Sequence, residues 1–406
     1  MKRLAVLLSL SLLAGCASTK PPAEALPAVF ADASFAPPSE PVRTDTLFAL
    51  SPAMQAYLNS SRFSSIIHER GARQGLVEAL YRKTDLQIEY ESTTTRTAAQ
   101  TYAARSGNCL SLVIMTAAFA KALGMPVRFQ HIDAENIWSR EGNLFLASSH
   151  VNILLSDRRL PNVYPGDLDM ELVVDFIPRN EAARLRSRYI DEEDIIALYL
   201  NNRAAEMLVQ GRVDDAYWWA RAAVRTRPRS ATVLNTLGAV YRQHGDLAMA
   251  EQAFRAALTR EPENIAVMRN LQPVLQELGK DEAARLLARQ IDEVDPVPPY
   301  HYFDQGILAL KAGEPGKART LFEREVRRAP FNDEFRFWLG VTYLQLGEVR
   351  GAREQLAKAV ENSTRRDTRA RYSAKLAYLR NLAADGRRIH PDEAHSSPYD
   401  REARIQ

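Results

Sequence analysis

Cysteine is scarce in this sequence, with only two among 406 residues. The short paired spacings of Cys and His that form zinc sites are absent. The glycine patterns that hold phosphates or dinucleotides, GxxxxGK[ST] and GxGxxG, are absent as well. The sequence therefore predicts neither a metal nor a cofactor.

The sequence also lacks a large excess of charge of either sign. Lys and Arg total 53 against 50 for Asp and Glu, and the signs are mixed along the chain. A nucleic-acid partner would need basic residues concentrated on one face, so none is expected. Beyond the N-terminus, no stretch approaches 18 uninterrupted apolar residues, the length that spans a membrane. A hydrophobic fraction of 46% still supplies cores for two or three domains.

The chain begins MKRLAVLLSLSLLAGCASTK, a basic start followed by an apolar run too short to span a bilayer. The tetrapeptide LAGC, which ends at Cys16, resembles a bacterial lipobox. The resemblance implies that residues 1–15 are a signal peptide and that lipid chains on Cys16 anchor the protein. It further implies the bacterial outer membrane, facing the periplasm. The proline-rich residues 16–45 are expected to form an extended tether that does not pack.

Residues 46–190 are expected to form an α+β domain. The helix over 109–123 is apolar nearly all round, which indicates a central buried helix. The patterns around it predict short helices over 46–85, a strand over 86–90, a helix over 97–105, and three later strands over 127–133, 144–156 and 171–178.

From residue 197 onward the sequence repeats every 34 residues. One series is proline, at Pro228, Pro262, Pro296 and Pro330; a second is alanine, at Ala216, Ala250, Ala284, Ala318 and Ala352; a third, mostly of small residues, is Ala204, Gly238, Gln272, Gly306 and Gly340. This pattern resembles the tetratricopeptide repeat, and implies an all-α solenoid of helical hairpins. Five repeats are expected over 197–364, then a capping helix over 365–386 and a disordered tail over 387–406.

Such a solenoid is expected to bind a protein or peptide in its groove. The groove position in successive first helices falls on Asn201, Asn235, Arg269, Phe303 and Phe337. Packing between neighbouring repeats is an equally good interpretation of these five residues.

Cys109 stands at the start of the buried helix, where the helix dipole and free N–H groups lower the pKa of a thiol. Asn108 or Ser106 is the candidate cap. A nucleophilic cysteine needs a base with an orienting partner. His150 begins a predicted strand, and Asp175 in VVDFIP requires a partner because an acid in an apolar strand is costly to bury.

The segments GNC and ALGMPV at the two ends of this helix, the strand at His150 and the strand holding Asp175 resemble the transglutaminase-like fold. The resemblance implies Cys109 as nucleophile, His150 as base and Asp175 as orienter. Many family members carry an aromatic residue two places after the histidine, where this chain has Asn152. His131 with Asp133 is the rival pair, and a buried structural thiol is the alternative for Cys109 alone.

Two functions remain open. One is a thiol hydrolase or acyltransferase acting on peptide or amide bonds, with hydrolysis favoured over crosslinking. The other is a non-catalytic interaction scaffold of an envelope complex. The sequence does not assign an oxyanion donor besides the Cys109 backbone; Gln100 and Asn108 are the candidates.

Overall fold

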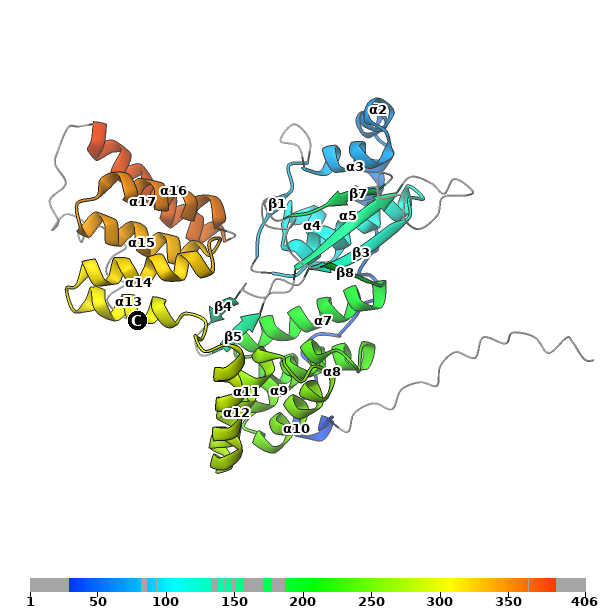
Figure 1. Cartoon of the computed structure of the whole chain (residues 1–406). Helices are drawn as coiled ribbons and strands as arrows, with labels where there is room; N and C mark the ends of the chain where they lie inside the picture. Colours follow the sequence, from blue (N-terminus) through cyan, green and yellow to red (C-terminus); the bar gives the residue numbers. More distant parts are fainter. Residues whose placement is uncertain are drawn as a thin grey trace, which may run out of the picture.

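The computed structural model describes residues 29–384 except for 82–85, 93, 133–137, 142–143, 148–149, 157–170, 177–186 and 364. A part with helices and strands comes first along the chain, followed by a long series of helices (Figure 1). The predicted signal peptide and the predicted disordered tail lie outside the described residues. Within the described part, no helix is both long and apolar enough to cross a membrane.

Four helices come first: α1 (Pro52–Leu58), α2 (Ser61–Arg70), α3 (Ala72–Tyr81) and α4 (Ala98–Ala104). Hydroxyl side chains at Ser51, Ser60 and Thr97 cap three of them by accepting backbone N–H groups of the first turn. Strand β1 (Glu89–Tyr90) pairs in parallel with β2 (Ser106–Gly107). The strand expected over 86–90 is therefore real but short, and it lies against the residues just before Cys109.

The central buried helix is α5 (Cys109–Ala122), and every residue from Leu110 to Ala120 is buried. Its first turn is capped by the side chain of Asn108. The helix ends at Ala122, and Gly124, two residues later, has a φ of 69°, in the left-handed region that favours glycine. The all-round apolar pattern thus predicted this helix correctly.

Strands β3 (Val127–Ile132), β6 (His150–Ser156), β7 (Glu171–Val174) and β8 (Ser187–Ile190) form one antiparallel sheet, in the order β7-β6-β3-β8. Helix α5 packs against β6, which is buried from His150 to Leu155 (Figure 1). The edge strand β8 was not predicted, because three of its four residues are exposed and it has no apolar alternation. The strand expected over 144–156 is two strands, since β5 (Leu144–Ala147) pairs instead with β4 (Trp138–Glu141).

Ten described helices pair along the chain into five hairpins. They are α7 (Glu192–Val209) with α8 (Val213–Thr226), α9 (Ala231–His244) with α10 (Leu247–Arg260), α11 (Ile265–Glu277) with α12 (Asp281–Val294), α13 (His301–Lys311) with α14 (Pro315–Arg328), and α15 (Asp333–Gln345) with α16 (Val349–Asn362). Each hairpin turns at a glycine with positive φ, and these glycines, again 34 residues apart, are Gly211, Gly245, Gly279, Gly313 and Gly347.

The small-residue series packs each first helix against its partner. A Cβ added at Gly238 would meet the ring of Phe254 at 2.6 Å, and one added at Gly306 would meet Phe322 at 2.7 Å. The third repeat breaks the series with Gln272. By the same period its second helix has Ala288 where the second and fourth repeats have phenylalanine, so in the third repeat the larger residue is on the first helix.

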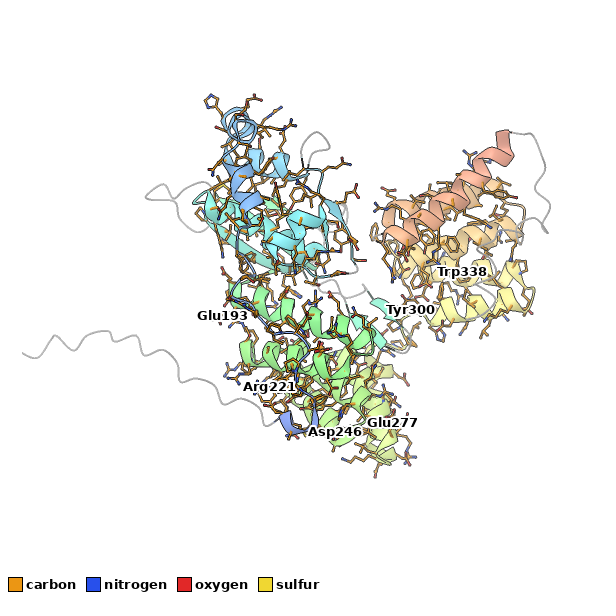
Figure 2. The ribbon with its side chains drawn as sticks, turned by 180° about the vertical axis from the view of Figure 1, so that it is seen from behind. Glu193, Arg221, Asp246, Glu277, Tyr300 and Trp338 are labelled. Atoms are coloured by element: carbon orange, nitrogen blue, oxygen red, sulfur yellow. The ribbon has the colours of Figure 1, made fainter. Side chains whose placement is uncertain are left out.

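The solenoid is divided after its third repeat. One hydrophobic core runs from the N-terminal part through α12, while α13–α15 and α15–α17 form separate clusters. The connecting segment contains Pro296, Pro298 and Pro299 and ends at Tyr300 in a left-handed conformation (labelled in Figure 2). Figure 1 shows α13–α17 as a stack beside α7–α12. The predicted cap is α17 (Arg366–Ala384), whose Tyr372 stacks on Phe337.

The expectation of an unpacked tether is wrong for residues 29–40, here called the strap, because they pack on the repeats. The strap holds the short helix η1 (Asp32–Ser34) and lies on the first repeats, with Val29 and Phe35 buried. Proline and small polar residues gave it the composition of a linker, but the repeats supply partners for its backbone and side chains.

Candidate active site

Cys109 occupies the first turn of α5 and is partly exposed. The turn is fixed by Asn108, whose Oδ1 accepts hydrogen bonds from the Ser111 backbone N–H at 2.9 Å and the Ser111 hydroxyl at 2.8 Å. The side-chain amide of Asn108 donates to Thr95 Oγ1 at 2.7 Å. The thiol is thereby held at the positive end of a rigid helix.

The structure brings Cys109, His150 and Asp175 together. His150 Nε2 lies 2.6 Å from Asp175 Oδ1, and His150 also forms a hydrogen bond with the Cys109 side chain. Because Nε2 faces the carboxylate, Nδ1 is the ring nitrogen that faces the thiol. Only 3% of His150 is exposed, so this imidazole is held between its two partners away from solvent.

The electrostatics of the group favour a thiolate beside an imidazolium. Burial acts to raise the pKa of Cys109, but the hydrogen bond and charge of His150 outweigh it, helped by the Val151 and Leu110 amides, and lower that pKa. Burial acts to lower the pKa of His150, yet the hydrogen bonds with Asp175 and Cys109 raise it to about 9. An ion pair with these pKa directions is suited to nucleophilic attack near neutral pH.

Tyr90 also belongs to this group of side chains, although no sequence pattern indicated it. Burial raises the pKa of Tyr90, and the neighbouring Cys109 thiolate adds to the increase, so the phenol keeps its proton and can donate. The phenol is within hydrogen-bonding reach of both the side chain and the backbone of Cys109. It arrives there because Tyr90 is in register with Gly107 across a two-residue strand pair, which no local pattern reveals.

The departure at Asn152 has a structural role. Asn152 follows His150 on the same face of β6, and its Nδ2 donates to Asp175 Oδ2 at 3.3 Å. Asp175 is therefore contacted through both of its oxygens by two side chains from one strand. Asn152 helps to orient the carboxylate that orients the histidine.

The two candidate oxyanion donors, Gln100 and Asn108, have other contacts. Gln100 is exposed, and its Oε1 atom accepts the Thr97 N–H at 3.0 Å in the capping box of α4. The Asn108 amide donates one hydrogen to Thr95, as described above. Both NH2 groups keep a hydrogen to donate, so their role as oxyanion donors stays a prediction.

The rival histidine lies on the other face of the sheet. His131 is directly opposite Val151 in the β3–β6 register, whereas His150 is opposite Ile132. Paired residues share a face, so His131 and His150 point away from each other. Asp133 lies outside the described residues. Among the residues that the structure describes, no group of three His, Cys, Asp or Glu side chains could hold a metal ion.

Hydrogen bonds connect the first turn of α5 to the first repeat. Glu206 of α7 accepts the Thr95 backbone N–H at 2.6 Å and pairs with Arg203 at 2.7 Å. Thr95 in turn holds Asn108. Burial raises the pKa of Glu206, because its hydrogen bonds only partly offset the loss of water. A series of hydrogen bonds from Glu206 through Thr95 to Asn108 therefore connects α7 of the solenoid to the start of α5.

The five predicted groove residues all have neighbours within the solenoid. Asn201 is buried, and Asn235 accepts a hydrogen bond from Asn270 at 3.0 Å. Arg269 holds both the backbone and the carboxylate of Asp295 at the end of α12. Phe303 packs on Phe322 and Phe335, and Phe337 packs on Tyr372 of α17. Packing accounts for the two phenylalanines, and partner binding at this position stays a prediction.

Comparisons with known proteins address the helical part. Two segments match family models described as tetratricopeptide repeat, over residues 231–264 and 303–368. These segments are tetratricopeptide repeats. They correspond to the second hairpin and to the fourth and fifth hairpins, which confirms three of the five repeats expected from the 34-residue period.

One similar protein is the type IV pilus assembly protein PilF of Pseudomonas aeruginosa, 27% identical over 122 residues. The match covers 30% of this chain and 48% of PilF, so it spans about half of that protein.

Similar solved structures include a thermophilic tetratricopeptide-repeat protein of Thermus thermophilus (22% identity, 45% of this chain and 99% of that chain, TM-score 0.28). Others are P. aeruginosa PilF (20%, 47% and 94%, TM-score 0.27) and YrrB, described as a repeat protein with an unusual peptide-binding site (21%, 45% and 94%, TM-score 0.25).

Proposed function

We propose that this chain combines a protein-binding repeat solenoid with a transglutaminase-like domain that performs thiol-dependent acyl transfer or hydrolysis on peptide or amide bonds. The observation that carries the catalytic part is the contact of Cys109 with His150, backed by Asp175 at 2.6 Å. Repeats of this kind bind peptides and proteins, and this supports the interaction part.

In the proposed reaction, His150 holds the proton of the Cys109 thiol while the thiolate attacks the carbonyl carbon. The imidazolium then gives its proton to the leaving amine as the carbon–nitrogen bond breaks, and a thioester remains on Cys109. Water attacks the thioester to give hydrolysis, or a second amine attacks to give transfer. We expect the Cys109 backbone N–H and the Tyr90 phenol beside it to donate hydrogen bonds to the oxyanion.

The test uses the full chain with Cys16→Ser, so that Cys109 is the sole thiol. The rate of iodoacetamide alkylation at Cys109 is followed against pH by mass spectrometry. A free thiol titrates at about pH 8.5, and we expect the Cys109 thiol to titrate well below that value. His150→Ala removes the stabilising cation, so the titration should move up toward the ordinary value.

His131→Ala is the matched control, because this histidine lies on the neighbouring strand but on the opposite face. It should leave the titration unchanged. A thiol that titrates normally, or one that responds equally to both histidine substitutions, would refute the catalytic proposal.

The second candidate is a non-catalytic scaffold, favoured by the repeats and by the similarity to a pilus assembly protein. It predicts that the Cys109→Ser variant complements a deletion strain as well as the natural chain does. Failure of Cys109→Ser with a normally folded, normally abundant protein supports the enzyme instead.

The location proposed for either function is the periplasmic face of the bacterial outer membrane, with a lipid on Cys16 as the anchor. The support is the LAGC tetrapeptide after a basic and apolar start.

A further inference from the structure

The strap is bound to the repeats as a separate peptide would be. Its backbone is held by side chains far away in the sequence: Tyr241 donates to the Val29 carbonyl at 2.6 Å, and the Ala31 N–H donates to Tyr217 Oη at 3.0 Å. Further along, Trp218 Nε1 donates to the Ala36 carbonyl at 2.7 Å. Side chains of α8 and α9 thus form hydrogen bonds with the strap backbone, as a neighbouring strand would in a sheet.

An acidic side chain is recognised by a matched arginine. Arg221 donates from Nε and Nη2 to the two oxygens of Asp32, both at 2.7 Å, and the Tyr217 hydroxyl donates to Asp32 at 2.5 Å. Paired donors of this kind select a carboxylate by geometry as well as by charge. Burial acts to raise the pKa of Asp32, but the Tyr217 hydrogen bond and Arg221 outweigh it and lower that pKa. Figure 2 labels Arg221 on the green repeat helices, near the short blue helix η1.

A phenyl ring three residues later provides the apolar contact. Phe35 stacks parallel to Tyr217, with ring centroids 3.9 Å apart, and also contacts Tyr241 and His244. It is 6% exposed, whereas the residues on either side of it are exposed. A buried aromatic ring surrounded by exposed neighbours is how a short peptide usually anchors itself.

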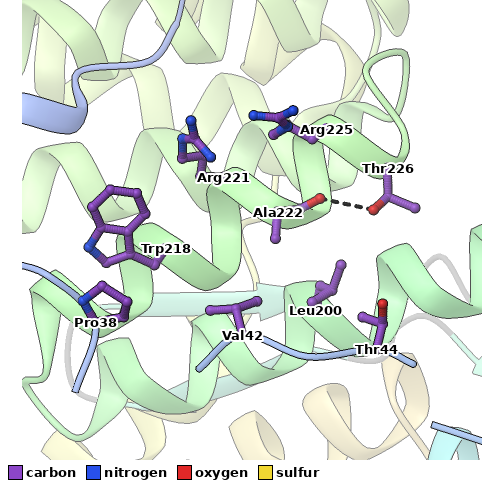
Figure 3. Close-up of a pocket in the computed structure, with 9 residues that line it drawn as sticks. All are labelled: Pro38, Val42, Thr44, Leu200, Trp218, Arg221, Ala222, Arg225 and Thr226. Atoms are coloured by element: carbon purple, nitrogen blue, oxygen red, sulfur yellow. Dashed lines mark hydrogen bonds between the residues drawn. The ribbon is translucent and has the colours of Figure 1, made fainter. Parts of the chain in front are cut away.

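The far end of the strap is held by hydrogen bonds and by one ion pair. The Ser39 N–H and hydroxyl donate to Asp215 at 2.7 and 3.0 Å, and Glu40 pairs with Arg203 at 3.1 Å. Beside this end lies a pocket of about 380 Å³, bounded by the chain at Pro38, Val42 and Thr44 on one side and by α7 and α8 on the other (Figure 3). The strap therefore leaves free space next to it on the same face.

We propose that this face of α8 and α9 is a peptide-binding site for a short segment with a carboxylate and, three residues later, a phenyl ring, and that the strap occupies the site in cis. The proposal rests on the protein-binding part of the proposed function and names its ligand. The site differs from the groove position of Asn201 and its equivalents. A partner peptide of the same chemistry binds by displacing the strap.

Displacement is opposed by the covalent link. A tethered segment competes at an effective concentration of about millimolar, so a peptide added to the natural chain binds weakly. Weakening the strap by Asp32→Ala with Phe35→Ala removes the carboxylate and the ring while leaving the repeat side chains unchanged. The full chain with these two substitutions presents the site open.

The experiment measures fluorescence anisotropy of a labelled synthetic peptide, residues 29–40, with each full-length protein. We expect binding to the strap-weakened chain at least about tenfold tighter than to the natural chain. Adding Arg221→Ala to the strap-weakened chain should weaken binding about tenfold or more, because the carboxylate loses its paired donors. Arg242→Ala is the matched control: this arginine of α9 pairs with Glu277 and has no strap contact among the described hydrogen bonds.

No binding by a strap-weakened chain that retains its circular dichroism spectrum and thermal unfolding overturns the proposal. So does binding that is insensitive to Arg221→Ala. If the double substitution unfolds the protein, Phe35→Ala alone repeats the test with the Asp32 contact in place. Complementation of a deletion strain separates this proposal from the proposed function as a whole. If Arg221→Ala complements fully, this site is not the one that binds the partner, and partner binding lies elsewhere on the repeats.

Discussion

Replacing Asn108 by alanine tests whether the cap of α5 controls the thiol. Asn108 is 8% exposed and makes three hydrogen bonds, two with Ser111 and one with Thr95. Loss of an N-cap costs about 1 kcal/mol. The substitution also leaves the buried Ser111 N–H without a partner, which costs about 1–3 kcal/mol, and removes the Thr95 contact, worth about 1 kcal/mol. The cost of the lost cap and the cost of the unpaired Ser111 N–H describe the same lost contact and are counted once. We therefore expect a total loss of about 2–4 kcal/mol in stability.

Asn264→Ala is the matched control. Asn264 caps α11 in the same way, by accepting the Val267 N–H at 3.1 Å, but it is not buried. Its side chain also donates to Glu261, so both of these contacts lie within the repeats. Its loss should cost about 1 kcal/mol. The two variants therefore remove the same kind of cap from a buried and from a more open helix start.

Amide hydrogen exchange measured by mass spectrometry reports the two helices separately. At about 1.4 kcal/mol per tenfold change, Asn108→Ala should speed exchange in α5 by about 30- to 1000-fold, if opening is local. The Cys109 alkylation titration should move to higher pH, because a frayed first turn no longer holds the Leu110 amide against the thiolate. Asn264→Ala should speed exchange in α11 only. Unchanged exchange in α5, or a Cys109 titration that responds equally to both variants, would show that the cap does not position the thiol.

Two further predictions concern the repeats and the anchor. Gly306→Ala should lower the thermal unfolding temperature, since its Cβ would meet Phe322 at 2.7 Å and overpacking costs about 1–3 kcal/mol against a helix-propensity gain of about 1 kcal/mol. Gly316→Ala, with no atom within 4 Å of the new Cβ, should raise it, and shifts of the same sign in both variants would contradict this packing. Cys16→Ala should release the exported protein from the membrane fraction and abolish labelling by radioactive palmitate; unchanged membrane association would contradict the lipid anchor.

Much of the helical architecture is predictable from the sequence by itself. The 34-residue period depends on contacts between helices adjacent in the chain, and Gly238 against Phe254 is an example only 16 residues apart. The buried helix α5 is visible because apolar residues occupy all its faces. Cys109, His150 and Asp175 could be nominated from their order and from the elements that hold them.

Other parts of the site depend on contacts that leave no local signal. Tyr90 reaches Cys109 through a strand pair only two residues long. Asn152 stood out only as a departure from a family pattern, and its contact with Asp175 supplies the reason for it. The sequence favoured His150 over its rival His131, but only the strand register shows that the two histidines lie on opposite faces of the sheet.

The strap shows the same division most clearly. Its composition is that of a flexible linker, and by itself it lacks the apolar residues for a core. Its order comes from Arg221, Tyr217 and Trp218, more than 180 residues away. Periodicity and composition thus determined the helices, the repeats and the candidate nucleophile, because those depend on near neighbours. The tertiary structure decided which distant side chains meet, because only the folded chain supplies hydrogen-bond and stacking partners for segments that cannot order alone.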